Sequence, residues 1–223
     1  MAPQENTKTS PPLRRDALRN RDLLVAAARE LFAEQGLNVP LDEIAKRAGV
    51  GNATLYRRFP VRGDLVEAVF HEDLAAVMAF GERARLMQDA WGALTAYLEV
   101  VCALLARDRG VSDLMTTRIE GVPTLDAIHA HNHATLSGLM RRAAADGELR
   151  TDVVTEDLLF ALGALGASLP ATETVRPGSW HRHLALLLDG FRATAQRPLP
   201  ERPLTAEETR DVHRELGGEP PQL

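Results

Sequence analysis

The stretch LDEIAKRAGVGNATLYRRF, residues 41–59, decides the fold of this chain. Apolar spacing predicts two short helices in it, over about 41–48 and 52–59. The tripeptide that begins at Gly49 is too short for an antiparallel hairpin, so it sets the second helix steeply across the first. The residue at the point where the two helices cross must then be small, and Ala45 occupies this position. Together these features predict a helix-turn-helix.

The second of these helices presents a face suited to a DNA major groove, since amide, hydroxyl and guanidinium groups bond base edges or phosphates. The residues predicted to contact DNA in this helix are Asn52, Ala53, Thr54, Tyr56, Arg57 and Arg58. The alternative is a solvated helix of an ordinary bundle. Such a helix would not need the spacing of Ala45 and Gly49 together with an unpaired basic face.

Charge is divided unevenly along the chain. The 223 residues carry a net charge of −5, but residues 8–62 hold eleven Lys or Arg against six acids, and residues 63–223 carry −9. This division predicts a small basic part that meets phosphates and a larger acidic part that they repel.

Composition narrows the class of protein. With 45% hydrophobic and 26% charged residues, the chain is neither disordered nor fibrous. One cysteine, Cys102, rules out an internal disulfide and a cysteine-rich zinc module, and we expect it to be a buried, inert thiol. The first twenty residues contain no apolar run typical of a signal peptide, and no later run predicts a membrane span. We therefore expect a cytoplasmic protein.

The remaining sequence predicts an all-helical protein of about nine helices, because apolar residues recur at helical spacing and no alternating strand pattern occurs. Prolines mark a mobile arm over 1–15 and a loose tail over 197–223. Besides the two short helices, we expect helices over about 16–35, 64–85, 88–106 and 123–146, a turn near 112–117, and two last helices with the stripes Leu158, Leu162, Leu165, Leu169 and Leu184, Leu187, Leu188, Phe191.

Two quoted segments, LLVAAARELFAEQG and LDEIAKRAGVGNATLYRRFPVRGDLVEAVF, closely resemble the tetracycline-repressor-type (TetR) family of bacterial regulators over about residues 19–79. The resemblance implies three N-terminal helices for DNA, and C-terminal helices for ligand binding and dimerisation. It places Thr54 and Tyr56 on phosphates or bases and Arg62 on the DNA backbone. Two residues depart from the family pattern: Pro40 offers a phosphate no hydroxyl or N–H, and Val61 offers no side-chain cap.

These observations predict a DNA-binding domain over 16–63 and a ligand-binding and dimerisation domain over 64–196. Polar side chains among the apolar stripes of the second domain, together with one tryptophan, are the predicted effector-binding residues: Trp91, Thr95, Arg118, His129 and His133. His129 and His133 lie one helical turn apart, which invites a metal site, whereas His131 points elsewhere. No companion ligand is suitably spaced, so we expect neither metal nor cofactor.

The predicted function is that of a ligand-responsive regulator in which a homodimer reads two half-sites of a palindromic operator. The family resemblance implies that the regulator is a repressor. The predicted dimer face lies on the last two helices, where the first leucine stripe runs beside the small residues Gly163, Gly166 and Ala167; one stripe can cover the protomer's own core while the other faces the partner. An effector near Phe80 would swing the DNA-binding domain. No enzyme motif is complete: His71 begins HEDLA, not HExxH, and GVGNAT lacks the third glycine and a preceding strand. The alternative function is a helical carrier whose basic part is incidental.

Overall fold

The computed structural model describes residues 12–107, 109–116, 122–194 and 197–217. Within these ranges the chain forms eleven α-helices and no strand. They are α1 (Pro12–Gln35), α2 (Leu41–Ala48), α3 (Asn52–Arg58), α4 (Arg62–Leu86), α5 (Ala90–Arg107), α6 (Arg109–Thr116), α7 (Pro123–Ala145), α8 (Thr155–Gly166), α9 (Leu169–Val175), α10 (Trp180–Phe191) and α11 (Ala206–Gly217).

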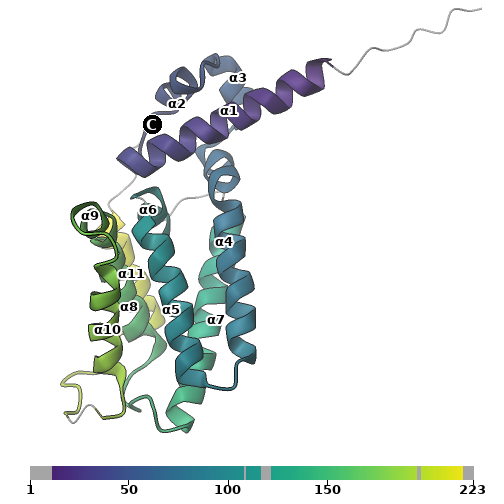
Figure 1. Cartoon of the computed structure of the whole chain (residues 1–223). Coiled ribbons are helices and arrows are strands. Elements are labelled where there is room, and N and C mark those ends of the chain that lie inside the picture. Colours follow the sequence, from purple (N-terminus) through teal and green to yellow (C-terminus); the bar gives the residue numbers. More distant parts are fainter. Residues whose placement is uncertain (1–11, 108, 117–121, 195–196, 218–223) are drawn as a thin grey trace, which may run out of the picture.

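Helices α1 to α3, which we call the head, sit across one end of a bundle formed by α4 to α11, which we call the body (Figure 1). The head contributes to the hydrophobic core, because apolar residues of all three of its helices are fully buried. These residues include Leu24, Leu31, Ile44, Ala45 and Leu55. Leu65, Val66 and Val69 of α4 belong to the same continuous core. The first turns of α4 therefore fix the head to the body.

The predicted helix-turn-helix is confirmed almost to the residue. Gly49 ends α2 in the left-handed conformation, with φ of 65°, and its N–H donates to the carbonyl of Lys46. Val50 donates its N–H to the carbonyl of Ala45 at 3.0 Å. The turn thus satisfies the last carbonyls of α2 in the manner expected of a glycine helix end.

In the body, α5 is the central helix and packs against both α4 and α7. By length and composition α5 could cross a membrane, with a mean hydropathy of 1.3, but 56% of it is buried inside the bundle. That burial is the pattern of a core helix.

The helix predictions fail at four places. Of the residues expected to form a turn near 112–117, those at 112–116 belong to α6, where Val111 and Leu114 are buried, and residue 117 lies outside the described residues. The stripe expected to run through Leu169 breaks into α8 and α9 at an angle of 43°. Pro170 explains this break, since it cannot donate to the preceding turn and suits the start of a helix.

The other two differences lie near the ends of the chain. Helix α1 begins at Pro12 rather than near Asp16, inside the predicted arm; the rest of the arm, residues 1–11, lies outside the described residues. The predicted loose tail contains α11, which packs against α6 and α8. Thr205 and Glu208 cap α11 reciprocally: the Glu208 N–H donates to the Thr205 hydroxyl at 3.2 Å and the Thr205 N–H to the Glu208 carboxylate at 2.9 Å. This T-x-x-E spacing is a capping-box pattern, so the start of α11 could have been predicted from the sequence.

Two polar links hold the head against the body. The peptide N–H of Leu37, between α1 and α2, donates to Asp113 of α6 at 3.0 Å, and the carbonyl of Leu37 accepts from Arg62 of α4 at 2.7 Å. Asp73 of α4 joins three helices: it bonds Arg29 of α1 at 2.9 Å and Arg107 of α5 at 2.7 and 2.8 Å.

Gly36 makes the first link possible. Its φ of +85° is strained for other residues, and an added Cβ would overlap the Asp113 carboxylate. We predict that Gly36→Ala destabilises the protein by more than about 1 kcal/mol. The matched control is Gly138→Ala in the interior of α7, where an added Cβ meets nothing within 4 Å. That change should stabilise the protein by roughly 0.5 to 1 kcal/mol. Urea unfolding measures both, and shifts in the same direction would contradict this account.

Candidate DNA interface and effector site

Helix α3 places the predicted DNA-contacting residues on its outer face. Asn52, Ala53, Arg57 and Arg58 are exposed, and Tyr56 is 52% exposed. Thr54 is half-buried, and its N–H bonds the carbonyl of Gly51 at 2.8 Å. Leu55 is fully buried in the head core. One helix therefore presents a polar and basic surface while its opposite side anchors it.

The cations of this surface are not neutralised within the head. Neither Arg57 nor Arg58 forms an ion pair with a described residue. Arg47 of α2 shows the contrast: it pairs with Glu30 of α1 at 3.3 Å and with Glu34 of α1 at 3.7 Å. Lys46, beside Arg47 in α2, is also exposed and has no ion-pair partner in the described part of the chain. It adds a cation to the head surface that the sequence analysis did not assign to DNA.

Arg62 stays a predicted contact to the DNA backbone, but it also has a partner within the protein. Its guanidinium is half-buried and donates to the Leu37 carbonyl, and this burial lowers its pKa from the ordinary value. We therefore assign Arg62 first to holding α4 against the loop that follows α1. Pro40 and Val61 give no side-chain cap to α2 and α4, as expected, and Asp64 instead accepts the N–H of Val61 at 3.4 Å.

The predicted effector residues that the structure describes lie in different surroundings on α5 and α7. His129 and His133 are exposed on α7, and His133 pairs with Glu156 of α8 at 3.2 Å. Trp91 is buried with the guanidinium of Arg192 4.0 Å above its ring centre. Thr95 has a buried hydroxyl without a partner in the described structure. Arg118 lies outside the described residues.

A different histidine is the buried one. His131 was expected to point away from the site, yet only 8% of it is exposed, and its ring lies between α4 and α7. Gly81 of α4 makes the room, because an added Cβ there would overlap the His131 ring. Burial lowers the pKa of His131, and the neighbouring Arg85 lowers it further. The buried imidazole is therefore biased toward its neutral form.

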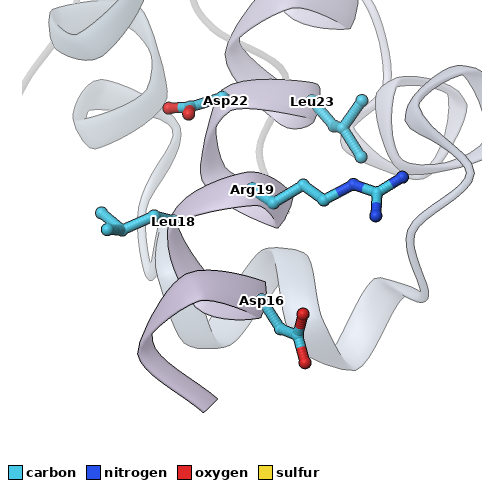
Figure 2. A pocket seen from close by; sticks show the side chains of 5 residues that line it. All are labelled: Asp16, Leu18, Arg19, Asp22 and Leu23. Atoms are coloured by element: carbon cyan, nitrogen blue, oxygen red, sulfur yellow. The ribbon is translucent and has the colours of Figure 1, made fainter. Parts of the chain in front are cut away.

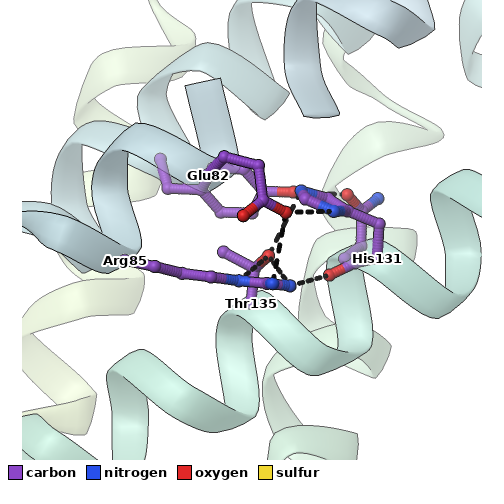
Figure 3. A network of polar contacts seen from close by, with 6 residues as sticks. Glu82, Arg85, His131 and Thr135 are labelled. Carbon is purple, nitrogen blue, oxygen red and sulfur yellow. Dashed lines mark hydrogen bonds and ion pairs between the residues drawn. The ribbon is translucent and has the colours of Figure 1, made fainter. Parts of the chain in front are cut away.

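His131 belongs to a polar network that joins α4 to α7 (Figure 3). Arg85 donates to the Thr135 hydroxyl at 3.0 and 2.7 Å and to the His131 carbonyl at 3.3 Å. Glu82 accepts from Arg85 at 3.2 Å and lies 3.4 Å from Nδ1 of His131. On the α5 side, the Tyr97 hydroxyl donates to the side-chain oxygen of Asn132. Burial raises the pKa of Tyr97, so this hydroxyl stays protonated.

The sequence of α7 contains a pattern from which part of this network could have been predicted. Ile128, Asn132, Thr135 and Leu139 follow helical spacing, so two polar residues interrupt an apolar stripe. Polar side chains on a core-facing stripe must be satisfied by one another or by a ligand. His129 and His133 lie off that stripe.

A separate hollow of about 490 Å³ lies beside the first half of α1, lined by Asp16, Leu18, Arg19, Asp22 and Leu23 (Figure 2). All five residues belong to one helix, and two of them are acids. A molecule there would be held by the described residues from one side only, so we assign it no function. The described residues also contain no group of three or more metal-ligating side chains close enough to hold an ion.

Comparison with known proteins agrees with this architecture. Residues 24–69 match the family model for bacterial regulatory proteins of the tetR family, and residues 89–193 match the C-terminal domain model of SbtR-like transcriptional regulators. An HTH-type transcriptional regulator of Staphylococcus aureus is 41% identical over 63 residues, which are 28% of this chain and 34% of the relative. The chain thus spans about a third of the length of the curated relatives it matches.

Solved structures cover more of the chain. A TetR transcriptional regulator from Streptomyces coelicolor is 32% identical with a TM-score of 0.52, and the match covers 78% of this chain and 99% of that one. FadR from Bacillus subtilis, solved in complex with stearoyl-CoA, shares the fold at 20% identity and a TM-score of 0.57, over 76% of this chain and 98% of that one. The helix-turn-helix geometry, the two domain matches and the Streptomyces relative show that this chain belongs to the TetR family of transcriptional regulators.

Proposed function

We propose that the protein is a repressor that binds a palindromic operator as a homodimer and is released by a small-molecule effector. The observation that carries this proposal is the exposed face of α3, which presents Tyr56, Arg57 and Arg58 without a described carboxylate partner on a rigidly packed helix-turn-helix. Phosphate attraction supplies affinity, and side chains that reach base edges supply specificity.

The proposed division of labour follows the two domain matches. Residues 16–63 would form the DNA-binding domain and residues 64–196 the effector and dimerisation domain, supported by the matches at 24–69 and 89–193. Both matches are to regulators, which supports a protein without catalytic activity and gives the carrier alternative no support. A DNA-binding protein with this family's architecture acts in the cytoplasm, so we keep that location as part of the proposal.

The dimer face needs revision. One of the two stripes was expected to cover the protomer's own core, but residues of both are buried there: Leu158, Leu162 and Leu184 are 1%, 6% and 2% exposed. The apolar residues left outside are Phe160 on α8, 42% exposed, and Leu186 on α10, 59% exposed. Helix α10 lies at the edge of the body opposite α4 (Figure 1). A four-helix interface built from the outer faces of α8 and α10 of each protomer would leave both heads free for DNA.

The α3 surface generates a prediction with internal controls. Tyr56→Ala and Arg57→Ala should weaken binding to the DNA upstream of the protein's own gene by about tenfold or more, with little change in thermal midpoint. Arg57→Ala should also reduce the salt slope of binding by about 0.9 if it contacts one phosphate. Arg47→Ala, which removes a cation already paired with α1, should leave that slope unchanged.

The same experiment separates recognition from folding. Leu55→Ala should instead cost about 2 to 5 kcal/mol of stability, because it empties a fully buried site. Fluorescence anisotropy with competitor DNA, and thermal unfolding, measure the two effects. Unchanged operator affinity in both the Tyr56 and Arg57 variants would disprove the proposed recognition surface.

The revised dimer face also makes a prediction. Phe160→Glu combined with Leu186→Glu should convert the protein to a monomer at micromolar concentration, since an interface core excludes unpaired charges. Leu86→Glu, at an 85% exposed position at the far end of α4, is the control and should leave the dimer intact. Light scattering reads the mass directly. A double variant that remains dimeric would rule out this face.

A further inference from the structure

We infer that the junction between α4 and α7 is a proton-sensitive latch: it is closed while the ring of His131 is neutral, and uptake of one proton by that ring opens it. The inference concerns the stability of the body in mild acid. It does not depend on the proposed DNA binding, and it gives the protein a response that needs no effector.

The latch is built around the hydroxyl of Thr135 on α7, which is fully buried. Its oxygen accepts two hydrogen bonds from Arg85 of α4, at 3.0 Å from Nε and 2.7 Å from Nη2 (Figure 3). A hydroxyl oxygen has two acceptor positions, so both are occupied. Nε2 of His131 lies 3.3 Å from the same oxygen. Nε2 can receive the proton of this hydroxyl, but it finds no acceptor there for a proton of its own.

The other nitrogen of the His131 ring faces a carboxylate. Nδ1 lies 3.4 Å from the carboxylate of Glu82 on α4. A negative charge favours a proton on the nitrogen that faces it. The neutral ring therefore carries its proton on Nδ1 and leaves Nε2 as an acceptor toward Thr135. Both neighbours favour this one tautomer.

A second proton must go to Nε2, where the structure offers it no place. Gly81 of α4 closes that side of the ring, since an added Cβ there would lie 2.3 Å from Nε2 of His131. An N–H at Nε2 therefore requires Arg85 to give up one of its hydrogen bonds to Thr135, or the ring to leave its slot. Either change breaks the polar link between α4 and α7.

The charged and titratable groups around the ring do not compensate the added proton. On α4, Arg85 repels it, and Glu82 is 63% exposed and already pairs with Arg85 at 3.2 Å. On α5 the facing group is Tyr97, which is uncharged because burial raises its pKa. On α8, Glu156 pairs with His133 instead. Burial and the charge of Arg85 accordingly lower the pKa of the buried imidazole.

The latch makes acid destabilising, because the folded protein resists a proton that the unfolded chain accepts. A histidine in an unfolded chain has a pKa of about 6.5. Below that pH the unfolded state binds one more proton than the folded state, so stability that is present above pH 6.5 is lost as the pH falls. For one such group, the equilibrium constant of unfolding rises by up to about tenfold between pH 7.5 and 5.5.

Urea unfolding of the wild type and of His131→Gln at these two pH values tests the latch. Glutamine can accept the hydroxyl proton of Thr135 as the ring does, but it takes up no proton in this range. The equilibrium constant of unfolding should therefore rise up to about tenfold more in the wild type than in the variant. An acid loss that is equal in the two proteins would overturn the inference.

His133→Gln is the matched control, since it removes an exposed histidine of the same helix. The protonated form of His133 is stabilised by Glu156 at 3.2 Å, so its contribution to the pH dependence has the opposite sign. This variant should keep the acid loss of the wild type or increase it. An acid loss that disappears in His133→Gln would contradict the assignment to His131.

Nuclear magnetic resonance of the wild type, labelled with ¹⁵N-histidine, keeps the inference testable if His131→Gln does not fold. The His131 ring is identified by its contact with the α-protons of Gly81. At pH 7.5 it should be the tautomer protonated at Nδ1, and at pH 5.5 it should stay neutral while exposed histidines are charged. When it titrates at lower pH, the Gly81 contact should disappear. A ring protonated at Nε2 at pH 7.5, titration together with the exposed histidines, or a charged ring that keeps the Gly81 contact would each disprove the latch.

Discussion

The continuity of α4 is the constraint on which the rest of the structure depends. Its first turns bury Leu65, Val66 and Val69 in the core that the head contributes to, and its last turns carry Glu82 and Arg85 into the polar network of the body. The helix has 25 residues, which corresponds to about 37 Å of length. Because one helix serves both parts, the head cannot change its position without a displacement that reaches the body.

The links around α4 make that dependence specific. Both backbone polar groups of Leu37 are bonded: its N–H donates to Asp113 of α6, and its carbonyl accepts from Arg62 of α4. Asp73 bonds cations from α1 and α5, and the hydrogen bond from Arg107 lowers the pKa of its carboxyl, so the bridge is fully charged at neutral pH. At the far end, Arg142 of α7 donates to the carbonyls of Arg85 and Gln88 at 2.9 and 3.1 Å and so closes the end of α4. The helix is thus fixed near both ends and has a small cavity between them.

The sequence predicts the head well because its structure is local. The turn at Gly49, the small Ala45 and the buried Leu55 lie within a few residues of each other, and the same stretch carries the family resemblance. The body depends on contacts between distant segments. In AIHAHNHA, helical spacing places His129 and His133 off the core-facing stripe, but only the distant Gly81 of α4 explains how a ring as large as that of His131 fits against the neighbouring helix. The leucine stripes of α8 and α10 are real, but periodicity cannot say whether an apolar face meets the protomer's own core or a partner.

The central claim is that the protein binds DNA as a dimer in which α4 of each protomer holds α3 in position for one half-site. Footprinting of the full chain on the DNA upstream of its own gene, with competitor DNA present, tests this claim most directly. A rigid two-fold dimer predicts two symmetry-related protected half-sites whose centres lie about 34 to 36 Å apart, or a whole multiple of that helical turn. Protection of a single half-site, or of no site that resists competitor, would contradict it.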